Sequence, residues 1–303
     1  MKILLLGANG QVGWELRRSL ATLGEVIALV RDPKRNLDGL CGDLEDPTGV
    51  AATVRAVKPD AVVNAAAYTA VDKAESDAER AAVVNSDAPA ALADAVVATG
   101  AMLVHYSTDY VFDGSGTSPW RESDTTGPLN VYGATKLAGE QAIQASGCRH
   151  LIFRTSWVYA ARGSNFAKTM LRLAAERDSL AVIADQFGAP TGAELIADVS
   201  AHCLLRAQAD PTVDGLYHLA AAGETCWNGY ARHVVGYAHG RGVALRAGPD
   251  SLDPIATSDY PTPATRPLNS RLDTGTLRTA FRLTLPDWRD GVDRMLAEHL
   301  ATA

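Results

Sequence analysis

The chain has 303 residues, of which 47% are hydrophobic and 21% charged, as is typical of one large globular domain or two smaller ones. Its formal net charge of −7 argues against a protein that binds nucleic acids or anionic membranes broadly. Four widely spaced cysteines without a C-x-x-C pair indicate reduced thiols, and the absence of a signal peptide or a long apolar run predicts a cytoplasmic protein without a membrane span.

Strand and helix patterns alternate through the first half of the chain. Continuous apolar runs predict strands that are buried on both faces of a parallel sheet, and glycine or proline ends the helical runs between them. The predicted strands cover residues 2–8, 25–30, 60–68, 101–109 and 150–159, and the predicted helices cover residues 13–24, 46–59, 77–100 and 130–142. This alternation predicts a doubly wound parallel α/β sheet of the Rossmann type.

The pattern loosens after about residue 160. We predict helices at residues 165–178, 193–207 and 285–300, short strands within 180–192 and 215–221, and an irregular proline-rich surface at 252–274. We expect residues 1–160 to form a dinucleotide-binding domain, with a later return of the chain at about 192–222. Residues 161–303 should form mainly a smaller, interleaved α/β substrate-binding region over the carboxyl edge of the sheet, where ligands bind.

The segment GANGQVG joins the first predicted strand to the first helix. Gly7 permits a tight turn, Gly10 lets the backbone approach a diphosphate at the helix N-terminus, and Gly13 lets the helix pack closely on the strand. The sequence therefore predicts a dinucleotide site, with Gln11 and Val12 in the same turn. A glycine-rich turn without a ligand is the alternative.

The end of the second predicted strand, IALVRDPKR, lacks the acidic residue that usually binds the ribose 2′-hydroxyl. Val30 occupies that position and Arg31 follows it. An arginine there accommodates a 2′-phosphate, so the sequence favours NADPH, with NADH as the second choice. A solvated loop arginine is the structural alternative. Asp43 and Leu44 are candidates for contacts with the adenine edge.

Tyr132 and Lys136 lie four residues apart in a helical run and should share one helix face. A fixed ammonium can lower the pKa of a nearby phenol toward neutral pH, which would make Tyr132 an acid catalyst. A half-buried tyrosine beside a solvated lysine is the alternative interpretation.

Three segments occur together: GANGQVG, YSTDYVF at residues 106–112 and YGATK at residues 132–136. Together they resemble the extended short-chain dehydrogenase/reductase family, and segments such as NAAAYTAVDKAE and RPLNSRL extend the similarity over nearly the whole chain. Within that family they resemble reductases of dTDP-linked 4-keto-6-deoxy sugars. The resemblance implies NADPH-dependent reduction of the C4 ketone of dTDP-4-dehydro-β-L-rhamnose to dTDP-L-rhamnose.

The resemblance also assigns roles to individual residues. Tyr132 would protonate the ketone oxygen as general acid, and Lys136 would lower the pKa of that phenol and hydrogen-bond the nicotinamide ribose. Thr108 would donate a second hydrogen bond to the developing alkoxide, a role for which Ser107 competes. The other residues expected at the cofactor are Ala67, Tyr68, Thr69 and Tyr106. The other residues expected at the sugar nucleotide are Asp109, Trp157, Asn165, Gln186 and Arg266.

Some members of the family bind Mg²⁺ through glutamates that match Glu15, Glu194 and Glu298, and hard oxygen ligands suit that ion. The resemblance therefore suggests a magnesium site, apart from hydride transfer, at the contact of a homodimer. Two alternatives stay open: a nucleotide-sugar epimerase or dehydratase of the same family, and a non-enzymatic regulatory subunit of the methionine adenosyltransferase type. Arg31 favours an exchangeable NADPH and hence net reduction, and the intact catalytic residues argue against a binding module.

Overall fold

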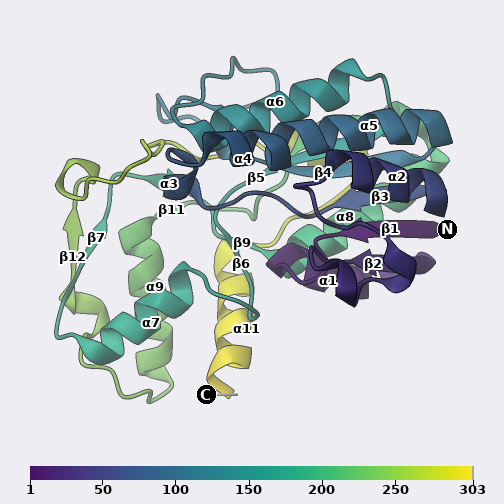
Figure 1. Cartoon of the computed structure of the whole chain (residues 1–303). Helices are drawn as coiled ribbons and strands as arrows, with labels where there is room; N and C mark the ends of the chain where they lie inside the picture. Colours follow the sequence, from purple (N-terminus) through teal and green to yellow (C-terminus); the bar gives the residue numbers. More distant parts are fainter. Residues whose placement is uncertain (302–303) are drawn as a thin grey trace.

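The computed structural model describes residues 1–301, and a six-stranded sheet lies at its centre (Figure 1). The strand order is β10-β5-β4-β3-β1-β2, and every neighbouring pair is parallel. The strands are β1 (Lys2–Leu6), β2 (Glu25–Leu29), β3 (Ala61–Asn64), β4 (Met102–Thr108), β5 (His150–Thr155) and β10 (Gly215–His218). The predicted doubly wound parallel sheet is therefore confirmed.

Helices cover both faces of this sheet (Figure 1). On one face lie α1 (Gln11–Ala21), α8 (Ala193–Ala209) and α10 (Gly275–Phe281), and on the other lie α2 (Pro47–Val57), α5 (Ala88–Thr99) and α6 (Val131–Ala145). Ile3 and Leu5 of β1 belong to the apolar cluster under α1 and α8, whereas Leu4 and Leu6 belong to the cluster under α2 and α5. Burial on both faces explains why β1 is apolar at every position after Lys2.

The helix predicted at residues 77–100 forms as α4 (Ala78–Ala82), a π-helical turn (Val83–Asp87) and α5, after the short helix α3 (Val71–Ala74). By length and composition alone, this helical run at residues 78–99 could cross a membrane. Half of its most apolar stretch is buried inside the protein, as in the core helix of a globular domain. The absence of a membrane contact stays a prediction.

A second region packs beside the carboxyl edge of the sheet. Its helices are α7 (Phe166–Glu176), α9 (Trp227–Gly240) and α11 (Trp288–Ala301), which share an apolar cluster around Tyr230 and Trp288. Its short paired strands are β6 (Val158–Tyr159) with β9 (Thr191–Gly192), β7 (Leu180–Ile183) with β12 (Leu252–Ile255), and β8 (Phe187–Gly188) with β11 (Thr225–Cys226).

Between β9 and β11 the chain returns to the sheet: α8 packs on α1, and β10 extends the sheet beside β5. We keep the division of the chain at about residue 160, with a return at about 192–222, as a proposal.

Several features differ from the sequence-based expectations. The strand β12 (Leu252–Ile255) pairs with β7 within the stretch 252–274 that was expected to be irregular. The predicted strand at 150–159 breaks into β5 and β6 because Trp157 adopts a left-handed backbone conformation with a φ of 48°. The helices α9 and α10 were not predicted. Glycines at 229, 236 and 240 lower the helical propensity of α9, and burial of its Tyr230 face against α7 and α11 supplies the stabilisation that the local sequence lacks.

Candidate functional site

A cavity of about 900 Å³ opens where β1, β3 and β4 end. The strand order reverses between β1 and β3, which is where open α/β sheets bind ligands. Most of the predicted cofactor and substrate residues line this cavity: Gly7, Gly10, Gln11, Val12, Arg31, Asp43, Leu44, Ala67, Tyr68, Thr69, Tyr106, Thr108, Asp109, Tyr132, Lys136, Trp157 and Arg266.

The turn between β1 and α1 has the geometry of a phosphate cradle. Gly7 has a φ of 79°, and a Cβ there would lie 2.7 Å from the backbone nitrogen of Ala66, so only glycine fits. Gly13 does not line the cavity; its Cα packs directly against the carbonyl of Gly7. The helix begins after Gly10 without a side-chain cap, which leaves the first N–H groups available for an anion.

The loop after β3 is held by the π-helical turn. Asn85 of that turn is buried; its Oδ1 accepts from the backbone N–H of Tyr68 at 2.9 Å, and its Nδ2 donates to the Tyr68 carbonyl at 3.1 Å. The same Nδ2 lies 3.2 Å from the hydroxyl of Thr135 on α6. Asn85 therefore ties the predicted cofactor loop to the helix that carries Tyr132 and Lys136, and sequence reasoning missed it.

At the end of the cavity near β2, Glu45 joins two arginines. Arg31 Nη1 lies 3.7 Å and Arg80 Nη2 lies 2.5 Å from the same Glu45 Oε1. The Arg80 guanidinium also lies over the ring of Tyr68. The sequence predicted Arg31 but not Glu45 or Arg80, because nothing local connects α4 with the loop after β2.

Tyr132 lies in the first turn of α6, and its phenol faces Thr108 at the end of β4. Burial raises the pKa of Tyr132, a hydrogen bond with Thr108 lowers it, and the neighbouring Asp109 and Tyr110 raise it. The net shift is upward, which keeps the phenol protonated at neutral pH, as a proton donor requires. Ser107 also lines the cavity, but the hydrogen bond to Tyr132 favours Thr108.

Lys136 is buried beneath Tyr132. Its Nζ donates to the carbonyl oxygen of Tyr106 at 2.6 Å and lies 3.1 Å from Nε2 of His105. Burial lowers the pKa of Lys136 to about 8, while Glu140 raises it. The predicted lowering of the Tyr132 pKa by Lys136 is therefore not observed, because the Lys136 amine is directed toward other partners.

Asp109 follows Thr108 and is 2% exposed. Its Oδ1 accepts a hydrogen bond from the Thr108 hydroxyl at 3.0 Å. Burial raises the pKa of Asp109 to about 6, although hydrogen bonds with Ser270 and Thr108 lower it. A carboxylate held in so buried a position is destabilising when charged, which is a common feature of functional sites.

We expect Asp109→Asn to stabilise the fold at neutral pH. Because the folded-state pKa of about 6 exceeds the ordinary value of 3.8, the folded protein binds this proton more tightly, and stability is lost as pH rises between these values. Two pKa units correspond to at most about 3 kcal/mol. Urea unfolding should show a gain for the variant at about pH 7.5 that largely disappears near about pH 4. An equal change at both pH values would contradict the raised pKa.

Trp157 and Arg266 close the cavity on the side of the second region. The Trp157 ring stacks on Trp227 of α9, with ring centroids 3.7 Å apart. Arg266 pairs with Asp72 at 2.7 Å and donates to the Tyr110 hydroxyl at 3.3 Å. Trp227 was missed in the sequence because the helix that carries it was not predicted.

Asn165 and Gln186 do not line the cavity, in contrast to the prediction. Asn165 caps α7: its Oδ1 accepts from the backbone N–H of Lys168 and its Nδ2 donates to the carbonyl of Ala160. Gln186 is buried and accepts a hydrogen bond from Nε1 of Trp227 at 3.1 Å. Gln186 thus orients a cavity residue without reaching the cavity itself.

The three predicted metal ligands do gather, on α1, α8 and α11, but two arginines pair with them. Burial raises the pKa of Glu194, Arg294 lowers it, and the nearby Glu298 and Glu15 raise it. Arg294 lies 3.3 Å from Glu194 and 3.8 Å from Glu298, and Arg18 lies 3.6 Å from Glu15. Within residues 1–301, no group of His, Cys, Asp or Glu side chains is arranged to hold a metal ion. These residues do not fit a Mg²⁺ site, so the metal prediction is not supported.

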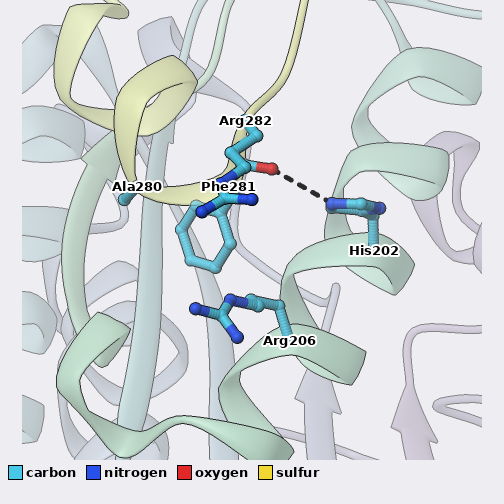
Figure 2. Close-up of a pocket in the computed structure, with 5 residues that line it drawn as sticks. All are labelled: His202, Arg206, Ala280, Phe281 and Arg282. Atoms are coloured by element: carbon cyan, nitrogen blue, oxygen red, sulfur yellow. Dashed lines mark hydrogen bonds between the residues drawn. The ribbon is translucent and has the colours of Figure 1, made fainter.

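A smaller cavity of about 330 Å³ lies between α8 and the end of α10 (Figure 2). It is lined by His202, Arg206, Ala280, Phe281 and Arg282, and His202 Nε2 donates to the carbonyl of Phe281 at 3.1 Å. It contains none of the predicted site residues. We therefore place the chemistry in the large cavity.

Comparison with known proteins agrees with this geometry. The family model of the RmlD substrate binding domain matches residues 1–301. The dTDP-4-dehydrorhamnose reductase of Salmonella typhimurium is 57% identical over 302 residues, covering 100% of this chain and 99% of that protein.

Two solved structures carry the same name. The dTDP-4-dehydrorhamnose reductase of Clostridium acetobutylicum is 33% identical with a TM-score of 0.87 and covers 100% of both chains. That of Bacillus anthracis, in complex with NADP, is 31% identical with a TM-score of 0.85, covering 98% of this chain and 99% of that chain. The chain therefore belongs to the RmlD substrate-binding-domain family, together with these dTDP-4-dehydrorhamnose reductases.

Proposed function

We propose that this protein is an enzyme that reduces the C4 ketone of dTDP-4-dehydro-β-L-rhamnose to dTDP-L-rhamnose with a nicotinamide cofactor. The main support for the proposal is that one cavity contains Thr108, Tyr132 and Lys136 together with the N-terminus of α1. That N-terminus follows a glycine and has no side-chain cap. The similar protein from Salmonella typhimurium, matched over its whole length, is named for this reaction. The similar structure from Bacillus anthracis contains NADP.

In this reaction the bound cofactor supplies the hydride, and the residues of the chain handle the proton. Tyr132 donates its phenolic proton to the ketone oxygen as the alkoxide develops, and its raised pKa keeps that proton in place until then. Thr108 lies beside the phenol, and its hydroxyl, which donates to Asp109 Oδ1 in the structure, would turn to donate a second hydrogen bond to the same oxygen. Trp157 and Trp227 offer an apolar wall for the sugar nucleotide.

Turnover tests the proposal directly. The purified protein is mixed with dTDP-4-dehydro-L-rhamnose and NADPH, the absorbance of the reduced nicotinamide is followed, and the sugar product is identified. We expect one equivalent of cofactor to be oxidised for each dTDP-L-rhamnose formed. A product formed without net oxidation of the cofactor would instead identify an epimerase, and an absence of turnover would contradict the proposed reaction.

We further propose that NADPH is preferred over NADH. Val30 leaves the ribose position without a carboxylate, while Arg31 and Arg80 converge on Glu45 at that end of the cavity. The side chain of Arg31 is 71% exposed and its contact with Glu45 is long, so it can turn toward an incoming 2′-phosphate.

Arg31→Ala should weaken NADPH binding more than NADH binding. A charged hydrogen bond contributes about 1.5–3 kcal/mol, so the ratio of the two dissociation constants should move by about tenfold or more. Arg35→Ala is the matched control, since Arg35 is exposed in the same loop but does not line the cavity. Titration of each variant with both cofactors gives the ratio. If Arg31→Ala weakened the binding of NADPH and NADH equally, Arg31 would have no role in distinguishing the two cofactors.

The homodimer and the cytoplasmic location remain predictions from the sequence and the resemblance. Light scattering on the purified protein, with and without EDTA, would measure the subunit number. Because Arg18 and Arg294 already pair with the clustered glutamates, we expect EDTA to leave both mass and activity unchanged.

A further inference from the structure

Lys136 contacts a buried histidine that the proposed reaction does not use. His105 lies on β4 and is 1% exposed, and its Nε2 is 3.1 Å from Lys136 Nζ. On the other side of the ring, Nδ1 is 3.2 Å from Nδ2 of Asn64, the residue paired with His105 on the neighbouring strand β3. Asn64 is also 1% exposed. The side chains of Asn64, His105 and Lys136 thus form a hydrogen-bonded row beneath α6.

A backbone hydrogen bond determines which atoms of Asn64, His105 and Lys136 donate and which accept. Burial and the charge of Lys136 hold the pKa of His105 well below its ordinary value, so the imidazole is neutral and has one donor and one acceptor. Asn64 Oδ1 accepts from the backbone N–H of Ala66 at 3.2 Å, which turns the amide NH₂ toward His105 Nδ1. Nδ1 must then accept, and the ring proton lies on Nε2, facing Lys136.

An N–H that faces Lys136 restricts the protonation state of its amine. A neutral amine has a lone pair that can accept from His105 Nε2–H, whereas an ammonium has only donors. Lys136 can therefore be charged without a donor–donor conflict at His105 only if the imidazole proton moves to Nδ1 and Asn64 turns its oxygen toward the ring. That turn gives up the hydrogen bond from the Ala66 N–H to Asn64. The protonation of Lys136 and the tautomer of His105 are two parts of one equilibrium.

We propose that His105, oriented by Asn64, is a positioning residue whose tautomer is coupled to the protonation state of Lys136. The arrangement in the structure stabilises the neutral amine and so favours release of a proton from Lys136. This inference deepens the proposed reduction. There, the Tyr132 O–H bond breaks as the sugar O–H bond forms. For the transfer that follows, the Lys136 amine turns from the Tyr106 carbonyl toward the phenolate. An N–H bond of Lys136 then breaks as the Tyr132 O–H bond forms again, and solvent returns a proton to Lys136.

Other groups around Lys136 do not have the effect that His105 has on the protonation state of the amine. Glu140, one turn further along α6, raises the pKa of Lys136, but its carboxylate is bound by Arg154 of β5 at 2.6 Å. Tyr132, one turn earlier on α6, is neutral because its pKa is raised. The carbonyl of Tyr106 accepts from either form of the amine. Among the contacts of Lys136 within residues 1–301, His105 alone must change its hydrogen-bonding role when the amine gains or loses a proton.

The tautomer can be observed directly by NMR of protein that carries ¹⁵N-labelled histidine, with His105→Gln to assign the signal. We expect His105 to stay neutral and to change from the Nδ1–H to the Nε2–H tautomer as the pH rises through the pKa of Lys136, which is about 8. In Lys136→Met this change should disappear. A tautomer that does not vary with pH, or that varies equally in Lys136→Met, would overturn the proposal. No sugar is present, so this test is independent of the proposed reaction.

Kinetics provides the second test. Asn64→Asp places an acceptor against Nδ1 and should hold the Nδ1–H tautomer, so that the basic limb of the kcat–pH profile moves to higher pH. His105→Leu should lower kcat by about tenfold while KM stays within about twofold, because it removes the partner of Lys136 and Asn64 but no residue that lines the cavity. His105→Gln keeps an amide for Lys136 and should restore most of kcat. Equal losses in the leucine and glutamine variants, with unchanged pH profiles, would show that His105 serves packing alone.

Discussion

Replacing Tyr132 with phenylalanine should lower kcat by about 10²–10⁴-fold and leave cofactor binding intact, since general acid catalysis contributes a factor of this size. Phenylalanine keeps the ring that packs edge-on against Tyr110, with centroids 5.7 Å apart, and removes only the hydroxyl. The cavity and the glycine turn are untouched by this change. Cofactor titration and steady-state kinetics on the same preparation separate the two effects.

Tyr110→Phe is the matched control for this experiment. Its ring lines the same cavity, but its hydroxyl is directed to Arg266 at 3.3 Å rather than to Thr108. We expect its effect to fall mainly on KM for the sugar nucleotide. A decrease in kcat of less than about fivefold for Tyr132→Phe would remove Tyr132 from the role of acid.

The buried ion pair beneath the active site should give the largest effect on stability. Arg154 of β5 donates from Nε and Nη2 to Glu140 of α6, at 2.6 Å for the shorter bond, and the two side chains are 5% and 1% exposed. Glu140→Leu leaves the guanidinium buried without a counter-charge, so we expect the free energy of unfolding to fall by about 3–5 kcal/mol. Urea denaturation near neutral pH measures it.

A surface pair provides the comparison. Arg172 and Glu176 on α7 form an ion pair of similar length, 2.9 Å, but their side chains are 60% and 52% exposed. Glu176→Leu should cost less than about 1 kcal/mol, because solvent screens both charges. Adding Arg154→Met to Glu140→Leu should recover part of the loss, since an apolar pair needs no counter-charge. If Glu140→Leu and Glu176→Leu lowered the free energy of unfolding by similar amounts, burial would not explain the contribution of the Arg154–Glu140 pair to stability.

The sheet and the cofactor turn follow from local patterns in the amino-acid sequence. The run KILLLGA is apolar at every position after its first residue because β1 is buried on both faces, and that signal is local. The glycines at 7 and 13 were predicted from their spacing in GANGQVG, and the structure places each where a Cβ would collide with backbone. Tyr132 and Lys136 were recognisable as a pair because one helix carries both.

The electrostatics of the site depend instead on how the helices and strands pack together. The sequence predicted that Lys136 lowers the pKa of Tyr132, whereas burial of the phenol raises it and Lys136 points to His105 and Tyr106. Burial depends on which helices cover the sheet, and no short segment records it.

Contacts between distant segments were hidden for the same reason. Glu45 contacts Arg80, and Asn64 contacts His105, and each pair is separated by more than thirty residues in the sequence. The stacking of Trp157 on Trp227 depends on α9, whose glycines weaken the sequence signal for a helix. Local patterns encode the period of a strand or helix and the turns between them. Which side chains then face one another is decided by how the elements pack, so the residues that orient the catalytic groups became visible only in the folded chain.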